Sequence, residues 1–454
     1  MSQSGWPGVA ARHWLEKILL ERMGYPFELT STDSAELKLS LPGFQGFIQF
    51  ECDPGAFNRN DSALPCASWS AVKEGWAPPC GQTLPVPGKS TLRLPLIQKE
   101  NFGFMVYYDL LGMVYWILSR SEEVGRSDLD EHDRFSAKSA HAVKYDYLER
   151  PVVDEWLSIL RDLICINWPD LKLLKHEFSM KVSHDVDEPS RYAFRSLPRW
   201  VRAIGGDIIK RRDVSGVLKA LIVKCASRKS LSSFDPANTF DWIMSQSEKE
   251  GIASAFYFIC GRTDLTRDAD YELEHPAIRE LLRRINKRGH EIGLHPSYNS
   301  YLSNTVIHGE AARLRRVCLE EGIAQAAWGG RMHFLRWSQP ATLRAWDEAA
   351  MSYDSTLGYA ELVGFRCGTC FEYPAFDPVL QKMLSVRIRP LIVMDVTLTS
   401  TSYLALGCGD AAFDKVKMLK DACRKVNGQF TLLWHNNNLV TESERRLYLR
   451  SLKC

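Results

Sequence analysis

Two aspartates with a single residue between them follow a strongly apolar run in the second half of the chain, in Ser183-His184-Asp185-Val186-Asp187. In an extended segment side chains alternate, so Asp185 and Asp187 project to the same side. Two carboxylates this close remain charged only beside a cation, either a metal ion or an arginine. For an isolated pair of this spacing, the alternative is that one aspartate caps the next helix while the other is solvated.

A second polar cluster lies in RGHEIGLHPSYN, where His290 and His295 bracket a short apolar run. Imidazole and carboxylate together suit a borderline divalent ion such as zinc. A lone histidine is more often structural than a ligand, so the metal hypothesis depends on the two clusters meeting in space.

Further polar groups follow later apolar runs, and the elements between them indicate how all could converge. After Lys175, strand-like runs alternate with longer amphipathic stretches, which is typical of β and α units around a parallel sheet. Sites in such folds form at the carboxyl ends of the strands. The expected strands are 178–186, 254–259, 291–294, 326–328, 391–396 and 430–434, and the polar groups that follow them include Arg331, His333, Asp395, His435 and Asn436.

The order of these motifs resembles the polysaccharide deacetylase superfamily (NodB-homology domain, carbohydrate esterase family 4) across roughly residues 175–454. The resemblance implies a distorted (β/α)7-type barrel. It implies that Asp185 is the catalytic base and that Asp187 and His295 are metal ligands. Gly330-Arg331 is similar to the motif whose arginine pairs with the catalytic aspartate.

The resemblance extends to the end of the chain. Leu433-Trp434-His435 is similar to the motif that supplies a histidine as general acid, and Asp395 is placed like the aspartate that orients it. The reaction that the resemblance implies is amide hydrolysis, in which negative charge develops on the acyl oxygen. Without a metal, Arg331, His333 or backbone amides would have to stabilise this oxyanion.

One position departs from the family pattern. Four residues beyond its first ligand the family places a second metal histidine, whereas this sequence has Asn299, a far weaker zinc ligand. His333 stands where the family usually has proline, so it could supply the missing imidazole or contact the sugar. Because Asn299 occupies the position of the family's second metal histidine, a divalent metal, with zinc favoured, is expected at Asp187, His295 and Asn299.

Substrate contacts are expected around the same site. Asp354 and Arg366 suit a polar pocket wall, and the resemblance places similar residues near the substrate. Tyr298 and Asn436, next to the second and last motifs, are expected to contact the sugar together with His333. Cys367 and Cys370 have redox-motif spacing without a thioredoxin-like context, so a structural or substrate-loop role is favoured.

The first 174 residues predict a smaller α/β domain preceding the barrel at 175–454. Helix-like patterns at 13–23 and 151–166 flank strand-like stretches at 36–41 and 44–50 and a Pro/Gly/Cys-rich loop at 66–89. The apolar stretch 101–118 is short for a bilayer span and contains Asp109, so a buried helix is expected. LSRSEE and DRFSAKSAHAVKYDYLERPVVDEW resemble a domain that precedes such deacetylases in bacterial surface-polysaccharide gene sets.

Composition restricts the class of protein, its partners and its compartment. The 454 residues are 45% hydrophobic and 25% charged, which excludes a disordered or fibrous chain. A net charge of +2 gives no overall bias toward nucleic acid, and no nucleic-acid partner is expected. The twelve scattered cysteines are read as reduced thiols, and no secretory signal is recognisable, so the cytoplasm is the expected compartment. The basic segment 191–229 suits anionic lipid at the inner face of a membrane, a pocket for a diphosphate-linked sugar, or a solvated helix.

The sequence therefore predicts a hydrolase that removes an N-acyl group, acetyl being expected, from a sugar of a surface-polysaccharide precursor, lipid- or nucleotide-linked. Two alternatives remain open on the same fold. One is a catalytically inactive sugar-binding barrel, which the replaced ligand would favour. The other is a metal-independent hydrolase of small amides or imides.

Overall fold

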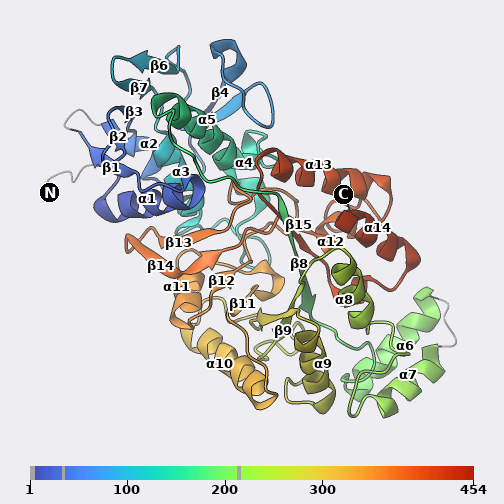
Figure 1. The fold of residues 1–454 in the computed structure, drawn as a ribbon. Helices are drawn as coiled ribbons and strands as arrows, with labels where there is room; N and C mark the ends of the chain where they lie inside the picture. Colours follow the sequence, from blue (N-terminus) through green and yellow to red (C-terminus); the bar gives the residue numbers. More distant parts are fainter. Residues whose placement is uncertain (1–5, 33–35, 212–215, 454) are drawn as a thin grey trace.

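The computed structural model describes residues 6–32, 36–211 and 216–453, with the side chains of 203, 206–211 and 216–219 left aside. It is a mixed α/β structure in which a curled nine-stranded sheet, surrounded by helices, carries a smaller α/β part at one end (Figure 1). This arrangement confirms the predicted fold class, a distorted (β/α) barrel preceded by a smaller α/β unit.

The N-terminal part is built on a five-stranded sheet in the order β1-β2-β3-β7-β6, with a separate β4-β5 hairpin. Apolar side chains alternate with polar ones in β2 and β3, so one face of the sheet is buried against helices. The strands are β1 (Glu28–Ser31), β2 (Glu36–Ser40), β3 (Phe47–Glu51), β4 (Cys66–Trp69), β5 (Leu84–Pro87), β6 (Ile97–Glu100) and β7 (Gly103–Val106). The helices are α1 (Val9–Met23), α2 (Pro54–Phe57), α3 (Leu110–Leu118), α4 (His141–Lys144) and α5 (Val152–Asn167), with short 3-10 turns at Ala71–Glu74, Ser121–Glu123 and Ala137–Ser139.

The barrel sheet has the order β13-β14-β12-β11-β10-β9-β8-β16-β15, and its neighbours are parallel except for β13 against β14. Its strands are β8 (Ser179–Val186), β9 (Ala255–Ile259), β10 (Glu291–His295), β11 (Gly329–Gly330), β12 (Tyr353–Asp354), β13 (Tyr373–Asp377), β14 (Lys382–Ile388), β15 (Val393–Met394) and β16 (Gln429–Leu433). The helices are α6 (Leu197–Arg211), α7 (Gly216–Ala226), α8 (Phe240–Lys249), α9 (Pro276–Lys287), α10 (Asn304–Glu320), α11 (Ala341–Glu348), α12 (Asp395–Thr399), α13 (Asp410–Lys425) and α14 (Glu442–Lys453), with 3-10 turns at His333–Leu335 and Asn436–Asn438.

Glycines let large rings fill the interior of the barrel. A Cβ on Gly329 would lie 2.0 Å from the ring of Tyr353, and one on Gly293 would lie 2.4 Å from the ring of Tyr257. The two tyrosine hydroxyls are 3.0 Å apart and both rings are buried. The barrel is therefore closed by packed side chains below the carboxyl ends of the strands, and the site has to lie above them.

Four sequence predictions needed correction. The stretch 101–118 is not one helix, because β7 occupies its start and α3 begins only at Leu110, capped by the Asp109 carboxylate, which accepts from the Gly112 N–H at 2.7 Å. The expected strand at 326–328 lies instead at Gly329–Gly330, and that at 391–396 shrinks to Val393–Met394. The 66–89 loop contains the β4-β5 hairpin.

The basic segment 191–229 forms most of α6 and α7, while residues 212–215 lie outside the described ranges. Throughout the part of the chain that the structure describes, no helix is both long and apolar enough to cross a membrane. Cys367 and Cys370 are buried, and the Sγ of Cys370 lies 3.3 Å from Asp154 Oδ2 of α5, so this pair belongs to the packing between the two halves.

Candidate metal centre and active site

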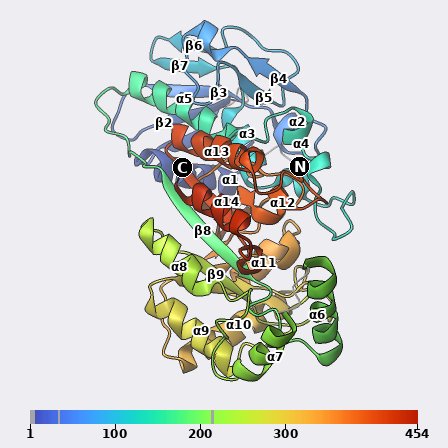
Figure 2. The ribbon, with the colours of Figure 1, turned by 90° about the vertical axis from the view of Figure 1, so that its right-hand side faces the viewer.

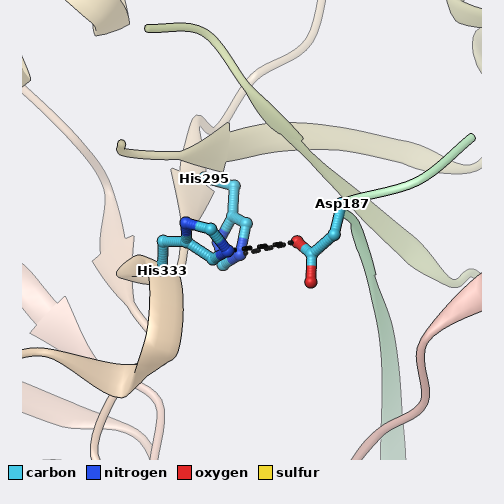
Figure 3. A group of neighbouring side chains, drawn as sticks. All are labelled: Asp187, His295 and His333. Carbon is cyan, nitrogen blue, oxygen red and sulfur yellow. Dashed lines mark ion pairs between the residues drawn. The ribbon is translucent and has the colours of Figure 1, made fainter. Parts of the chain in front are cut away.

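Asp187, His295 and His333 form a compact group at the carboxyl ends of three strands. Asp187 lies one residue past β8, His295 is the last residue of β10, and His333 follows β11 (Figure 3). The Nε2 atoms of His295 and His333 lie 3.2 and 3.8 Å from Oδ1 of Asp187. Ligands bound at about 2 Å in tetrahedral geometry are separated by roughly 3.3 Å, so the group matches the dimensions of a zinc-like site.

Both imidazoles are oriented by a bond at the other ring nitrogen. Nδ1 of His295 lies 2.6 Å from the backbone oxygen of Arg331, which can only accept a hydrogen bond. Nδ1 of His333 lies 3.1 Å from Oδ1 of Asp268. These contacts place the Nδ1 proton on the outer side and direct Nε2 toward Asp187, which is the usual arrangement of metal-binding histidines.

The carboxylate of Asp187 is suited to bind a cation. Its Oδ1 is a buried atom with no hydrogen-bond partner among the described residues, although the residue as a whole is half-buried. Burial favours the neutral acid, but His333, His295 and His435 outweigh it and lower the pKa of Asp187. Burial likewise opposes the charge on His295, yet Asp185 and Asp187 raise the pKa of that imidazole. An unpartnered carboxylate oxygen facing two Nε2 atoms therefore fits a divalent cation, and three ligands leave a position open for water.

Asp185 lies beside this group and is fixed by a buried arginine. Nη1 of Arg331 donates to its Oδ1 at 2.7 Å, while its Oδ2 lies 3.8 Å from Nε2 of His295. Nη2 of Arg331 donates to Ser183 Oγ at 2.9 Å and to the Ser355 hydroxyl at 3.1 Å, and its Nε donates to the backbone oxygen of Ser355 at 2.9 Å. Arg331 is thus committed to positioning Asp185, which leaves it unsuited to an oxyanion role.

His435, two residues past the end of β16, faces the group and is paired with a carboxylate behind it. Its Nδ1 lies 2.8 Å from Oδ1 of Asp395, and its Nε2 lies 3.7 Å from Oδ2 of Asp187. Burial alone would lower the pKa of His435, but Asp395, Asp187 and Asp185 raise it to about 10. The ring is therefore an imidazolium at neutral pH, the form that a general acid needs.

These residues open into a pocket of about 190 Å³. The polar wall holds the residues described above. The rest of the lining is Arg134, Phe334, Leu335, Met394, Val396 and Tyr403. The combination of a charged wall and an apolar wall suits a small group with a polar end and a hydrocarbon end.

The N-terminal half completes one side of this pocket. Nη1 of Arg134 donates to the backbone oxygen of Phe334 at 2.9 Å, and Nε of Arg336 donates to the backbone oxygen of His132 at 2.8 Å. Phe334 and Leu335 both have positive φ, 59° and 56°, which is uncommon for apolar side chains. The segment around Arg134 therefore braces a strained turn directly after His333.

The structure does not bring Asn299 into the metal-ligand group. Its Nδ2 donates to the backbone oxygen of Thr263 at 3.2 Å, and its Oδ1 accepts from Nη1 of Arg336 at 2.9 Å. His333 contributes the imidazole instead.

The four other residues expected to bind substrate are held by protein partners, outside the lining of the 190 Å³ pocket. Arg366 is buried in an ion pair with Glu123 at 2.6 Å. Asp354 is buried and accepts from Nε1 of Trp337 at 3.1 Å, and burial raises the pKa of this carboxyl to about 6. Nδ2 of Asn436 donates to the backbone oxygens of Glu188 and Ala237. The hydroxyl of Tyr298 lies 2.8 Å from Nδ1 of His132.

Sequence reasoning missed two functional positions, Asp268 behind His333 and Arg134 in the pocket wall. Asp268 lies in a loop with several other charged residues, so residue type alone does not distinguish it. Arg134 is in the N-terminal half, and the DRFSAKSAHAVKYDYLERPVVDEW stretch that contains it was the available signal.

Comparisons with known proteins bear on the two halves separately. Residues 10–169 match a family model described as "Family of unknown function (DUF7033)". A search of curated proteins finds no match to this chain.

Solved structures similar to this chain include the following three. A "putative polysaccharide deacetylase" from Mycobacterium smegmatis aligns with a TM-score of 0.40 and 15% identity, covering 63% of this chain and 84% of that one. PuuE allantoinase aligns with a TM-score of 0.37 and 12% identity, covering 63% and 85%. A "probable Polysaccharide deacetylase" from Pseudomonas aeruginosa PAO1 aligns with a TM-score of 0.36 and 12% identity, covering 61% and 84%.

Proposed function

We propose that the protein is a metal-dependent hydrolase that removes an N-acyl group, acetyl being expected, from a sugar of a surface-polysaccharide precursor. The observation that carries this proposal is the meeting of a three-ligand group, an arginine-fixed aspartate and an imidazolium around one pocket. Asp187, His295 and His333 would hold the ion, with zinc favoured for imidazole and carboxylate ligands.

The residues divide the work of amide hydrolysis. Asp185, held by Arg331, takes a proton from the attacking water, which adds to the acyl carbon. His435, held by Asp395, gives its proton to the departing nitrogen as the C–N bond breaks, so the products are a carboxylic acid and a free amino sugar. A divalent ion bound at the group would acidify the water and polarise the acyl oxygen.

The apolar wall supports a short acyl group. Leu335, Met394 and Val396 line the pocket, and the first two belong to one hydrophobic cluster against which Val396 packs. A methyl group buried against these side chains loses contact with water, which is favourable by about 0.8 kcal/mol per carbon. A pocket of about 190 Å³ suits an acetamido group with part of one sugar ring rather than a long acyl chain.

The catalytically inactive alternative depended on the replaced ligand at Asn299. His333 lies 3.8 Å from Asp187 Oδ1 with its Nε2 directed at the group, which provides a second imidazole from a different motif. The hydrolase is therefore the favoured function.

The test combines metal analysis with acyl release. We expect one divalent ion per chain in purified protein, and acetate release from N-acetylated sugars. Asp185→Asn keeps nearly the same shape and can still accept from Arg331, so we expect it to retain metal and fold while turnover falls at least about 10³-fold. Asp241→Asn, at an exposed position of α8, is the control. Undiminished acetate release by Asp185→Asn would show that Asp185 is not the base. A wild-type protein that contains no metal and releases no acetate would overturn the proposed function.

A further inference from the structure

A larger pocket, of about 420 Å³, opens beside the metal-ligand group, and Asp187 lines both pockets. We call it the arginine pocket, because four arginines lie in its lining. They are Arg195, Arg199, Arg202 and Arg267. The catalytic steps proposed above use none of them.

The arginines come mainly from α6 and the residues before it. Arg199 and Arg202 are three residues apart in α6 and so project from one face of the helix. Arg195 comes shortly before the helix begins. Figures 1 and 2 both show α6 beside α7 at the end of the molecule away from the N-terminal sheet. The arginine pocket, which α6 helps to line, therefore lies on the barrel side of the molecule.

The carboxylates of the pocket are largely engaged. Glu188 pairs with Arg195, and Asp270 accepts from Arg199 at 2.6 Å and from Arg262 at 2.7 Å. Asp268 accepts from the backbone N–H groups of Thr263, Asp264 and Tyr298 in addition to its contact with His333. These acids fix the cationic side chains and the site histidine.

Guanidinium donors are left over. Arg202 is exposed and has no hydrogen bond or ion pair with any residue that the structure describes. Nε of Arg195 is buried, also without a partner in the described ranges. A buried donor without an acceptor is unfavourable by about 1–3 kcal/mol, so the pocket favours a ligand that brings anionic oxygens.

We infer that the arginine pocket binds the phosphate or diphosphate of an activated sugar whose acylamino group lies at Asp187. This inference rests on the proposed function and names the substrate class. Guanidinium groups bind phosphate oxygens in pairs of parallel hydrogen bonds, which a neutral polysaccharide cannot offer. Asp187 is the residue that the two pocket linings share, so a sugar bound at one pocket would lie next to a phosphate bound at the other.

The first test measures anion binding without turnover. Inorganic phosphate is titrated calorimetrically into wild-type protein, Arg202→Gln and Arg228→Gln. Arg228 is exposed in the same basic segment but outside the pocket, so it removes the same charge as a matched control. We expect Arg202→Gln to weaken phosphate binding about 5- to 10-fold and Arg228→Gln to change it less than about 2-fold. Equal binding by all three proteins, or none by the wild type, overturns the inference.

The second test separates the inference from the proposed function. The kcat/KM for a uridine-diphosphate-linked N-acetylhexosamine is divided by that for its neutral methyl glycoside. We expect a ratio above about 10 in the wild type, reduced about 5- to 10-fold in Arg202→Gln. A ratio near one with clear acetate release would refute the phosphate site and keep the hydrolase. Arg202-dependent phosphate binding without release from any substrate would keep the site and refute the hydrolase.

A final arm distinguishes the two sources of a diphosphate. A short-chain prenyl-diphosphate N-acetylhexosamine is compared with the nucleotide-linked sugar at equal concentration. A higher kcat/KM for the prenyl compound identifies a lipid-linked substrate, and a higher value for the nucleotide compound identifies a soluble one. Both results support the arginine pocket only if the preference over the neutral glycoside depends on Arg202.

Discussion

Asp395 holds His435 at two points: Oδ1 lies 2.8 Å from Nδ1 of the ring, and Oδ2 accepts the backbone N–H of His435 at 3.0 Å. Asn438 also donates to Oδ2, at 2.9 Å. Because Asp395 directly follows β15 and His435 lies two residues past the end of β16, two neighbouring parallel strands fix the ring. Its Nε2 is thereby directed at the pocket.

Replacing this aspartate tests the orientation of the general acid. Asp395→Asn removes the charge that stabilises the imidazolium, and its amide Nδ2 would oppose the Nδ1 proton or the backbone N–H. We expect kcat for acetate release to fall about 10²- to 10³-fold with KM changed less than about 3-fold. Steady-state kinetics measure this, with the surface variant Asp421→Asn as the control. A kcat within 3-fold of wild type would show that His435 does not depend on Asp395.

The ligand set gives a second prediction, because Asn299 and His333 are rival third ligands. Asn299 is bonded to Thr263 and Arg336, whereas His333 faces Asp187. We expect His333→Gln to lower the bound zinc to below about 0.2 per chain after dialysis, and Asn299→Ala to leave it near one. Elemental analysis of the two purified variants measures both. The reverse pattern would return Asn299 to the ligand set.

Four strands of the barrel could be predicted closely from the sequence. β8, β10 and β16 are largely buried runs that end in or lead into polar residues, so both the strand and its site residue are visible. β9 is buried throughout and supplies no site residue, so only the strand is visible there. β11 and β12 have two residues each, and no periodicity can be recognised over so short a length.

The choice of ligand and of substrate contacts could not be predicted for a related reason. The path of the chain after β11 depends on two residues with positive φ, Phe334 and Leu335, and this turn directs His333 to the site. Arg366 was expected in the pocket wall, but it pairs with Glu123, which is 243 residues earlier in the chain. Residue types and local spacing do not predict which residues far apart in the chain will pair.

Asp268 gives a third prediction, on metal affinity. It is the acceptor at Nδ1 of His333, and partners of this kind typically contribute 10- to 100-fold to metal binding. We expect Asp268→Asn to weaken zinc affinity by about that factor, measured by competition with a chromophoric chelator. Asp264→Asn is the matched control, because Asp264 is in the same loop and its carboxylate accepts from Thr266 and Arg267 rather than from His333. Equal affinities in the two variants would mean that Asp268 does not tune the ligand.

Glu310 predicts a pH dependence of stability that is separate from the site chemistry. This carboxyl on α10 is buried and accepts the Ser297 N–H at 2.8 Å and the Ser297 hydroxyl. Burial raises its pKa from 4.5 to about 7 in the folded chain. The folded state then binds more protons than the unfolded state between these values. The resulting contribution of Glu310 to the free energy of unfolding is present in full below pH 4.5. It is lost as pH rises to about 7, and the loss is about 3 kcal/mol at most.

Glu310→Gln removes this titration while keeping a group that can accept from the Ser297 N–H and donate to its hydroxyl. We expect the variant to be more stable than wild type at pH 8, by about 1–3 kcal/mol, and to differ little at pH 5. Urea unfolding at the two pH values measures the free energy of unfolding of each protein. Glu280→Gln, at a half-buried position of α9, controls for losing one carboxyl elsewhere in the barrel. If wild type and Glu310→Gln lose the same free energy between pH 5 and pH 8, the Glu310 carboxyl is not the group that titrates.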